Sequence, residues 1–253
     1  MTRAHRYFIL FAIVWSALAN ASAGQTTAPA TDPAGVAPRE AVKAFRAALE
    51  ANDAHALAEM TWATDDSRRK LADACARVIV AGKRVADAAA ERFGRGGAGA
   101  GEPITRGGLG ALDQELRAID EAPVSEAGDV ATIALPSPPS RGDRPPRVLT
   151  LRRRATDGKW FVDVLEFAGF ADQDADPLEP GEADARIDLL YRLSRGLAEV
   201  ADDCAAGRYR TAGDVRAAVQ DRFHGAVQKS MEAMDSTRPS TRSSAGSVTQ
   251  PER

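Results

Sequence analysis

The 253-residue chain is short of aromatic residues, of positive charge and of long apolar runs, and each shortage excludes something. Aromatics make up 6% while alanine is abundant, so we expect a core of helix faces packed closely on small side chains. A formal net charge of −3 lacks the positive field of non-specific nucleic-acid binding, and we predict no nucleic-acid partner. No segment beyond residue 23 is apolar enough for a membrane span.

The first 23 residues have the three zones of an export signal. Arg3 and Arg6 give a positive start, residues 7–18 are mostly apolar, and Ala21-Ser22-Ala23 offers small residues to a signal peptidase. The apolar run is shorter than the roughly 20 residues of a bilayer span, which favours cleavage over a retained membrane anchor. We therefore predict an exported, periplasmic or extracellular protein that begins near Gly24. Cleavage removes two arginines and no acid, which changes the net charge from −3 to −5.

Two cysteines, Cys75 and Cys204, are the only candidates for a covalent cross-link. An oxidising compartment permits a long-range disulfide between them. Two separate buried thiols are the alternative, because free cysteine often serves as a small core residue. The cysteines do not form a zinc pattern with His55 and His224, since no ligand pair has the usual close spacing. We predict no metal and no cofactor.

Composition and hydrophobic periodicity divide the rest of the chain into segments. We predict an α+β fold that is mainly helical, with a small antiparallel sheet of about three or four strands and a C-terminal helical hairpin. The segments are a flexible lead-in (24–37), an α+β domain (38–168, with helices over 38–121 and antiparallel strands over 128–168), an acidic connector (169–183), the helical hairpin (184–235) and a disordered tail (236–253).

Several helix ends have sequence markers. Pro38 suits the first turn of a helix, Asp53 can cap the next, and Thr64 or Asp65 can cap a long helix that ends at Gly94. In the hairpin, Asp184 can cap the first helix and Gly207 end it. The second helix begins at Thr211, where Thr-Ala-Gly-Asp resembles a capping box with Asp in place of the usual Glu.

Three runs of β-forming residues predict strands at 130–135, 148–154 and 160–167. Asp157-Gly158 separates the last two, and this residue pair favours a tight type I′ hairpin turn. The glycine-rich run 94–101 has neither a preceding strand nor a following Lys-Ser or Lys-Thr, so it predicts a linker rather than a phosphate-binding loop.

Charged residues offer two weak candidate binding sites. Asp172, Asp174 and Asp176 have the alternate spacing of a calcium loop, but Pro177 and Ala183 stand where glycine and a bidentate glutamate are needed. An acidic linker is the better interpretation. Residues 152–154 are all arginine, yet successive strand residues point to opposite faces, so the triplet should not converge on an anion.

No catalytic group can be assigned from the sequence. His55 and His224 lie in charge-rich helices without a neighbouring nucleophile, which is typical of surface histidines. Asp163 and Glu166 fall on opposite faces of the last strand, so one of them could be a buried general base.

Two stretches together resemble a known superfamily. The helix PREAVKAFRAAL at 38–49, followed by Asn52-Asp53, resembles the opening of the nuclear transport factor 2-like superfamily. Residues 129–135 and 147–167, with Asp157-Gly158-Lys159-Trp160, resemble its closing hairpins. The resemblance implies a cone-shaped α+β fold with a curved sheet around a pocket; its members include isomerases, dehydratases and binding modules. No functional residue carries over to this chain.

The leading hypothesis is a non-enzymatic exported binding or interaction protein with an unidentified partner, for which another protein is a candidate. Met231 and Met234 form an apolar face that could contact one, although core packing is their more common use. The alternatives are a small-pocket isomerase or hydrolase that uses one buried carboxylate such as Asp163, and a helical envelope scaffold.

Overall fold

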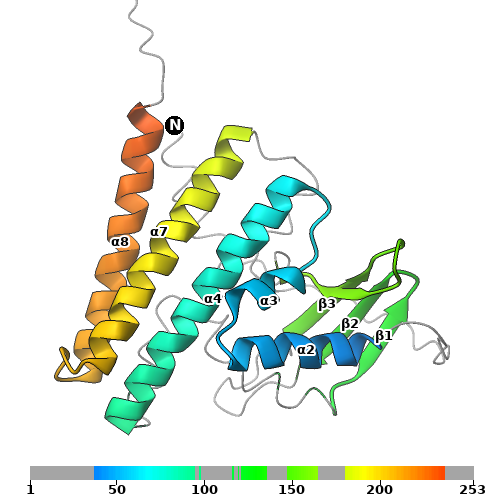
Figure 1. Cartoon of the computed structure of the whole chain (residues 1–253), viewed down its shortest axis with the longest axis horizontal. Coiled ribbons are helices and arrows are strands. Elements are labelled where there is room, and N and C mark those ends of the chain that lie inside the picture. The colour runs from blue at the N-terminus through cyan, green and yellow to red at the C-terminus, as the bar shows by residue number, and fades with distance from the viewer. Residues whose placement is uncertain are drawn as a thin grey trace, which may run out of the picture.

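The computed structural model describes residues 37–94, 97, 116, 119, 121–135, 147–164 and 180–236. The helices are α2 (Pro38–Glu50), α3 (Ala54–Glu59), α4 (Asp66–Phe93), α7 (Pro180–Ala205) and α8 (Ala212–Ser236). The strands are β1 (Val124–Ala127), β2 (Val130–Leu135), β3 (Arg147–Arg153) and β4 (Trp160–Val162). The fold is the expected helix-rich α+β arrangement, with a small antiparallel sheet and a C-terminal helical pair (Figure 1). The export segment, acidic connector and C-terminal tail lie outside the described residues.

Side-chain caps start α3 and α4 where the sequence predicts, whereas the predicted cap Asp184 is wrong, because α7 begins at Pro180 and Asp184 lies inside it. Asp53 accepts a 3.0 Å hydrogen bond from the Ala56 amide, and Asp65 rather than Thr64 caps α4. The long helix ends at Gly94, whose φ of 65° is a conformation that glycine adopts without strain. The predicted ends of these two helices are confirmed. They could be predicted because each depends on residues only a few positions apart.

The sheet is a simple meander, with neighbouring strands in chain order. β1 is a strand that the sequence prediction missed, and it is joined to β2 by Gly128 and Asp129 alone. Gly128 has a φ of 64° while Asp129 has no positive φ, as in a type II′ turn. Along β2, Ala131, Ile133 and Leu135 are buried and the residues between them are partly exposed, so one face of the sheet is covered.

The hairpin between β3 and β4 is confirmed, but its predicted turn is wrong. Arg153 pairs with Trp160, and the Arg154 amide donates to the Lys159 carbonyl over 2.8 Å, so four residues lie inside the loop. Gly158 has a φ of 68°, whereas Asp157 does not have the positive φ that a type I′ turn requires. β4 is also shorter than expected and ends at Val162.

The outer edge of β4 is partly covered by the chain that follows α3. The Trp62 amide donates to the Val162 carbonyl, and the Val162 amide donates to the Met60 carbonyl, each over 2.9 Å. Thr61 thereby forms an isolated parallel bridge with Val162. These bonds satisfy edge groups that would otherwise be open to pairing with another chain.

α4 runs through the middle of the molecule and contributes to two cores. α2, the sheet and the first half of α4 enclose one core, which includes Phe45 and Ile133. The second half of α4 packs with α7 and α8 around Val85, Leu197 and Val219. Figure 1 shows these three helices side by side, with α2 across the sheet. Close packing of this kind suits the alanine-rich α4.

α4 and α7 lie parallel with a constant register. Asp73 contacts Tyr191 and Arg84 contacts Asp202, and both pairs are separated by 118 residues. At the far end, Arg92 donates to the carbonyl of Gly207, where α7 has ended. The two helices therefore keep their register from the first to the last turns of α4.

This register keeps the two cysteines apart. The offset places Cys75 level with Leu193, and Cys204 lies eleven residues further along α7, or about 16 Å at the rise of an α-helix. A disulfide needs the two Cα atoms within about 7 Å. Both cysteines are free and buried, Cys75 in the first core and Cys204 in the second. The structure therefore contains two separate thiols and no Cys75–Cys204 disulfide.

Candidate functional site

An open depression lies where the first two turns of α4 meet α7. It has a volume of about 330 Å³ and is lined by Asp66, Arg69, Lys70, Asp73 and Tyr191. Four of these residues come from α4, at the three- and four-residue spacings that put side chains on one face of a helix. Tyr191 alone comes from α7, brought there by the parallel register. The site is therefore a surface formed between two helices.

The floor of the depression is held by a bond network between the two helices. The Tyr191 hydroxyl donates to Asp73 Oδ2 over 2.7 Å, and Arg77 Nε donates to the same oxygen over 2.8 Å. The Arg77 guanidinium also lies 5.7 Å from the centre of the Tyr191 ring. Burial by itself raises the pKa of Asp73, but the two donors outweigh it and the pKa is lowered. Asp73 is therefore held as a carboxylate.

The same network affects the tyrosine in the opposite direction. Burial, followed by the hydrogen bond to the Asp73 carboxylate, raises the pKa of Tyr191. A phenol that donates to a carboxylate is held in its neutral form, because its ionisation would place two negative charges side by side. Tyr191 is thus a fixed donor and not a proton-transfer group.

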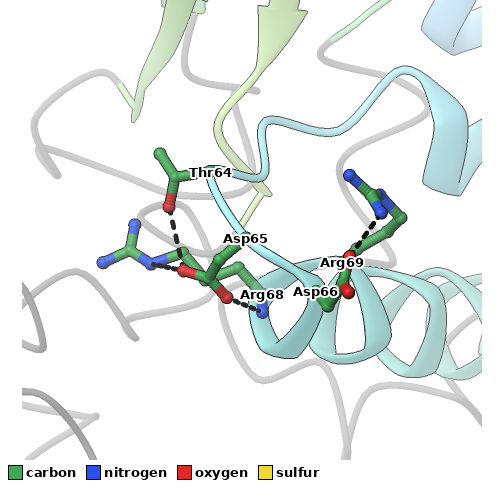
Figure 2. A network of polar contacts seen from close by, with 5 residues as sticks. All are labelled: Thr64, Asp65, Asp66, Arg68 and Arg69. Atoms are coloured by element: carbon green, nitrogen blue, oxygen red, sulfur yellow. Dashed lines mark hydrogen bonds and ion pairs between the residues drawn. The ribbon is translucent and has the colours of Figure 1, made fainter.

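The cap residue Asp65 binds the Arg68 amide in the first turn of α4, as Figure 2 shows. Asp65 Oδ1 accepts from the Arg68 amide over 2.8 Å, and Thr64 donates to the other oxygen over 3.1 Å. The backbone hydrogen bond from Arg68 is the main cause of the lowered pKa of Asp65. A free anion would have to compete with this carboxylate for the helix N-terminus, so the amides do not provide an anion site.

The rim of the depression carries two exposed cations. Arg69 contacts Asp66 over 2.7 Å, but both side chains are mostly exposed, at 70% and 88%. An exposed pair of this kind contributes roughly 0–1 kcal/mol, so a partner can displace it at little cost. Lys70 forms no ion pair within the described part of the chain. The depression can bind an anionic or hydrogen-bonding group beside side chains that the Asp73 network already holds in place.

The candidate base Asp163 is bonded to an arginine. Its side chain is 8% exposed, and Oδ2 accepts from Arg152 Nε over 2.8 Å. Its amide donates to the Thr150 carbonyl, which puts Asp163 on the same face of the sheet as Arg152. The residue is a buried carboxylate with a counter-charge, as buried charges require. Glu166, the other candidate for a buried general base, lies outside the described residues.

The arginine triplet does not converge, as the strand pattern predicts. Arg152 pairs with Asp163, Arg153 with Asp129, and Arg154 with the loop residue Asp157. Arg153 and Arg154 also stack on aromatic rings, Trp160 and Phe161 respectively. Each arginine therefore stabilises a different part of the hairpin.

The remaining candidates are dispersed over the surface. His55 lies 3.5 Å from Glu59 with its side chain 81% exposed, and His224 is exposed on α8. Among the residues described, no three His, Cys, Asp or Glu side chains are grouped so that they could hold a metal ion. Met231 is 45% exposed. The proposed calcium residues Asp172, Asp174 and Asp176 fall outside the described ranges.

The depression was missed by the sequence analysis. The alternating charges Asp66, Lys70, Asp73 and Arg77 follow helical spacing and could have marked a common face. Tyr191 has no comparable marker, because its position beside Asp73 depends on the packing of two helices 118 residues apart.

Comparisons of the chain with protein-family models, curated proteins and solved structures found no match. The resemblance to the nuclear transport factor 2-like superfamily stays a prediction. In the described ranges, every helix is too short or too polar to cross a bilayer.

Proposed function

We propose that this chain is an exported, non-enzymatic binding module that docks a partner on the depression between α4 and α7. The proposal rests on one contrast within the depression. The carboxylate of Asp73, on its floor, accepts hydrogen bonds from Arg77 and Tyr191. Lys70, at its exposed rim, forms no ion pair with another described residue. Groups that are fixed by structural bonds suit recognition better than proton transfer.

The floor of the depression supports docking because it is preorganised. Asp73 ties α4 to α7, so a partner meets side chains that have already lost their rotamer freedom. Less conformational entropy is then lost on association. The exposed Arg69–Asp66 pair is a weak bond that a partner can exchange for its own.

The alternative of an enzyme that uses Asp163 has less support. Its carboxylate is bonded to Arg152, and neither histidine of the described chain, His55 or His224, forms a bond with it. A helical scaffold is also less favoured, because α2 and the sheet enclose a core of their own instead of lying at the periphery.

Site-specific photocrosslinking in the native cells tests the docking surface. A photoreactive residue at position 66 should give one major adduct, identified by mass spectrometry as a single partner. The same label at position 229, on α8, should not give that adduct, and Lys70→Glu combined with the label at 66 should abolish it. Equal labelling at 66 and 229 would contradict the proposal.

Export has a separate test. The N-terminal sequence of protein recovered outside the cytoplasm should begin near Gly24. Recovery of material that retains Met1 would show that the first 23 residues are not removed.

A further inference from the structure

We infer that the partner of this depression presents an acidic protein segment, with carboxylates about 13 Å apart that contact Lys70 and Arg195 on either side of Tyr191. The inference rests on the proposed function and adds the chemistry of the ligand. It rests on the charged side chains of this face that form no ion pair with another described residue.

Most charges around the depression are already paired. Asp66 contacts Arg69, and Asp73 accepts from Arg77. On α7, one turn before the tyrosine, Asp188 contacts Arg192 over 2.6 Å. These pairs contribute no net charge to the surface.

Two cations remain on the same face. Lys70 lines the depression, and Arg195 follows Tyr191 by four residues, so both α7 side chains lie on one face of that helix. Arg195 is exposed, and neither cation forms an ion pair with another described residue. Asp184, seven residues before Tyr191 on the same face of α7, is exposed and likewise forms no ion pair with another described residue. The surface therefore keeps one net positive charge on a chain whose net charge is −3.

The spacing of the two cations sets the spacing of their ligands. The 118-residue register places Arg195 level with Arg77, seven residues beyond Lys70. Seven residues span about 10 Å along a helix. The two cations are on different helices, whose axes lie about 8–10 Å apart when packed, so the full distance between them is about 13 Å. An extended segment rises about 3.3 Å per residue and alternates its faces, so acids on one face match this distance at positions i and i+4. The aromatic ring of Tyr191 lies between the two cations, where the residues between the acids would pass.

Binding of synthetic peptides to the full mature chain tests this inference. The probe is a Gly/Ser-based peptide whose only charged side chains are glutamates at i and i+4, and its matched control has glutamine at both positions. We expect the glutamate peptide to bind and to weaken as salt is raised, because exposed charge pairs are screened. The glutamine peptide should bind at least about fivefold more weakly, in line with the loss of rim ion pairs.

Three variants locate the site. Lys70→Glu and Arg195→Glu should each weaken the glutamate peptide about fivefold or more, whereas Lys229→Glu on α8, with the same change of charge as Lys70→Glu, should leave binding within about twofold. Melting temperatures of the variants check that each one is folded.

Equal binding of both peptides, or equal loss in Lys229→Glu, would overturn the inference. Preference for a DNA oligonucleotide over the glutamate peptide would overturn it as well. An adduct at position 66 without any glutamate-peptide binding would leave the proposed function standing and reject only the acidic partner. Absence of both would reject the two together.

Discussion

At the scale of single residues, Asp73 shows how one carboxylate joins two helices. One oxygen accepts from Arg77 on its own helix and from Tyr191 on α7. A charged acceptor makes stronger hydrogen bonds than a neutral one, and partial burial reduces competition from water. The register of α4 against α7 is thus supported by a bond as well as by apolar packing.

Replacing Tyr191 by Phe removes this interhelical donor and keeps the ring. We expect a loss of about 1 kcal/mol in the free energy of unfolding, because Asp73 keeps only its bond to Arg77. Urea unfolding measures the change. Tyr209→Phe is the matched control, since no hydrogen bond of its hydroxyl is seen in the described chain, and it should cost less. An equal cost for both would contradict a role for the Asp73 bond.

The β3–β4 loop contains a second residue-scale feature with a pH dependence. Hydrogen bonding from Arg154, which donates from Nε and Nη2, lowers the pKa of Asp157 to about 2. The folded protein then releases this proton more readily than the unfolded chain, whose aspartate titrates near about 3.9. Its stabilising contribution is complete above that value and is lost as the pH falls through about 2.

An NMR titration of the Asp157 side chain tests this directly. We expect a midpoint near about 2 in the native protein and a clear upward shift in Arg154→Gln, which removes the main cause of the lowered pKa. The carboxyl of Asp214, whose pKa is lowered mainly by hydrogen bonds from the Thr211 and Arg210 amides, serves as an internal reference that the Arg154 substitution should not move. An unchanged midpoint in Arg154→Gln would refute the assignment of cause.

At the scale of secondary-structure elements, short-range bonds define where α8 begins. The Asp214 amide donates to Thr211 Oγ1 over 3.2 Å, and the Thr211 amide donates back to Asp214 Oδ2 over 2.9 Å. This is the reciprocal capping box that the sequence predicts, with aspartate in the usual place of glutamate. The bond from the Thr211 amide, then that from Arg210, lowers the pKa of Asp214.

Removal of either side of this box should destabilise the protein. We expect Thr211→Ala to cost about 1 kcal/mol in the free energy of unfolding, and Asp214→Ala to destabilise the protein as well. The double variant should cost less than the sum, because both changes break the same pair of bonds. Chemical denaturation of the three variants measures this coupling. Strict additivity would mean that the two side chains act independently.

At the scale of the whole molecule, α4 joins two cores that composition alone would assign to separate units. Its first half packs against the sheet and its second half against α7 and α8, while Ile187 of α7 belongs to the first core. The α+β part and the helical pair therefore share a helix. Cys75 and Cys204 lie on opposite sides of this division.

The state of the cysteines provides a test of this arrangement. Burial raises the pKa of Cys75 to about 12 and also raises that of Cys204, so both thiols should react slowly with a thiol reagent in the folded protein. Under denaturing, non-reducing conditions, two thiols per chain should react. Zero reactive thiols after denaturation would show a disulfide and contradict the observed register.

The sequence by itself determined the features that depend on neighbours a few residues apart. The caps at Asp53 and Asp65, the end of α4 at Gly94 and the strand at 130–135 were all predictable, because each follows from local hydrogen bonding or from a regular apolar pattern. Short β1 was missed because its four residues are mostly exposed and lack an alternating pattern.

Only the tertiary structure decided which distant residues meet. The type of turn at Asp157, the separation of Cys75 from Cys204 and the contact of Tyr191 with Asp73 all depend on backbone geometry or on a register between segments 118 residues apart. Local propensity does not specify such a register, because it is set by how the side chains of α4 and α7 interlock when both faces are buried. The candidate binding surface exists only because of that packing.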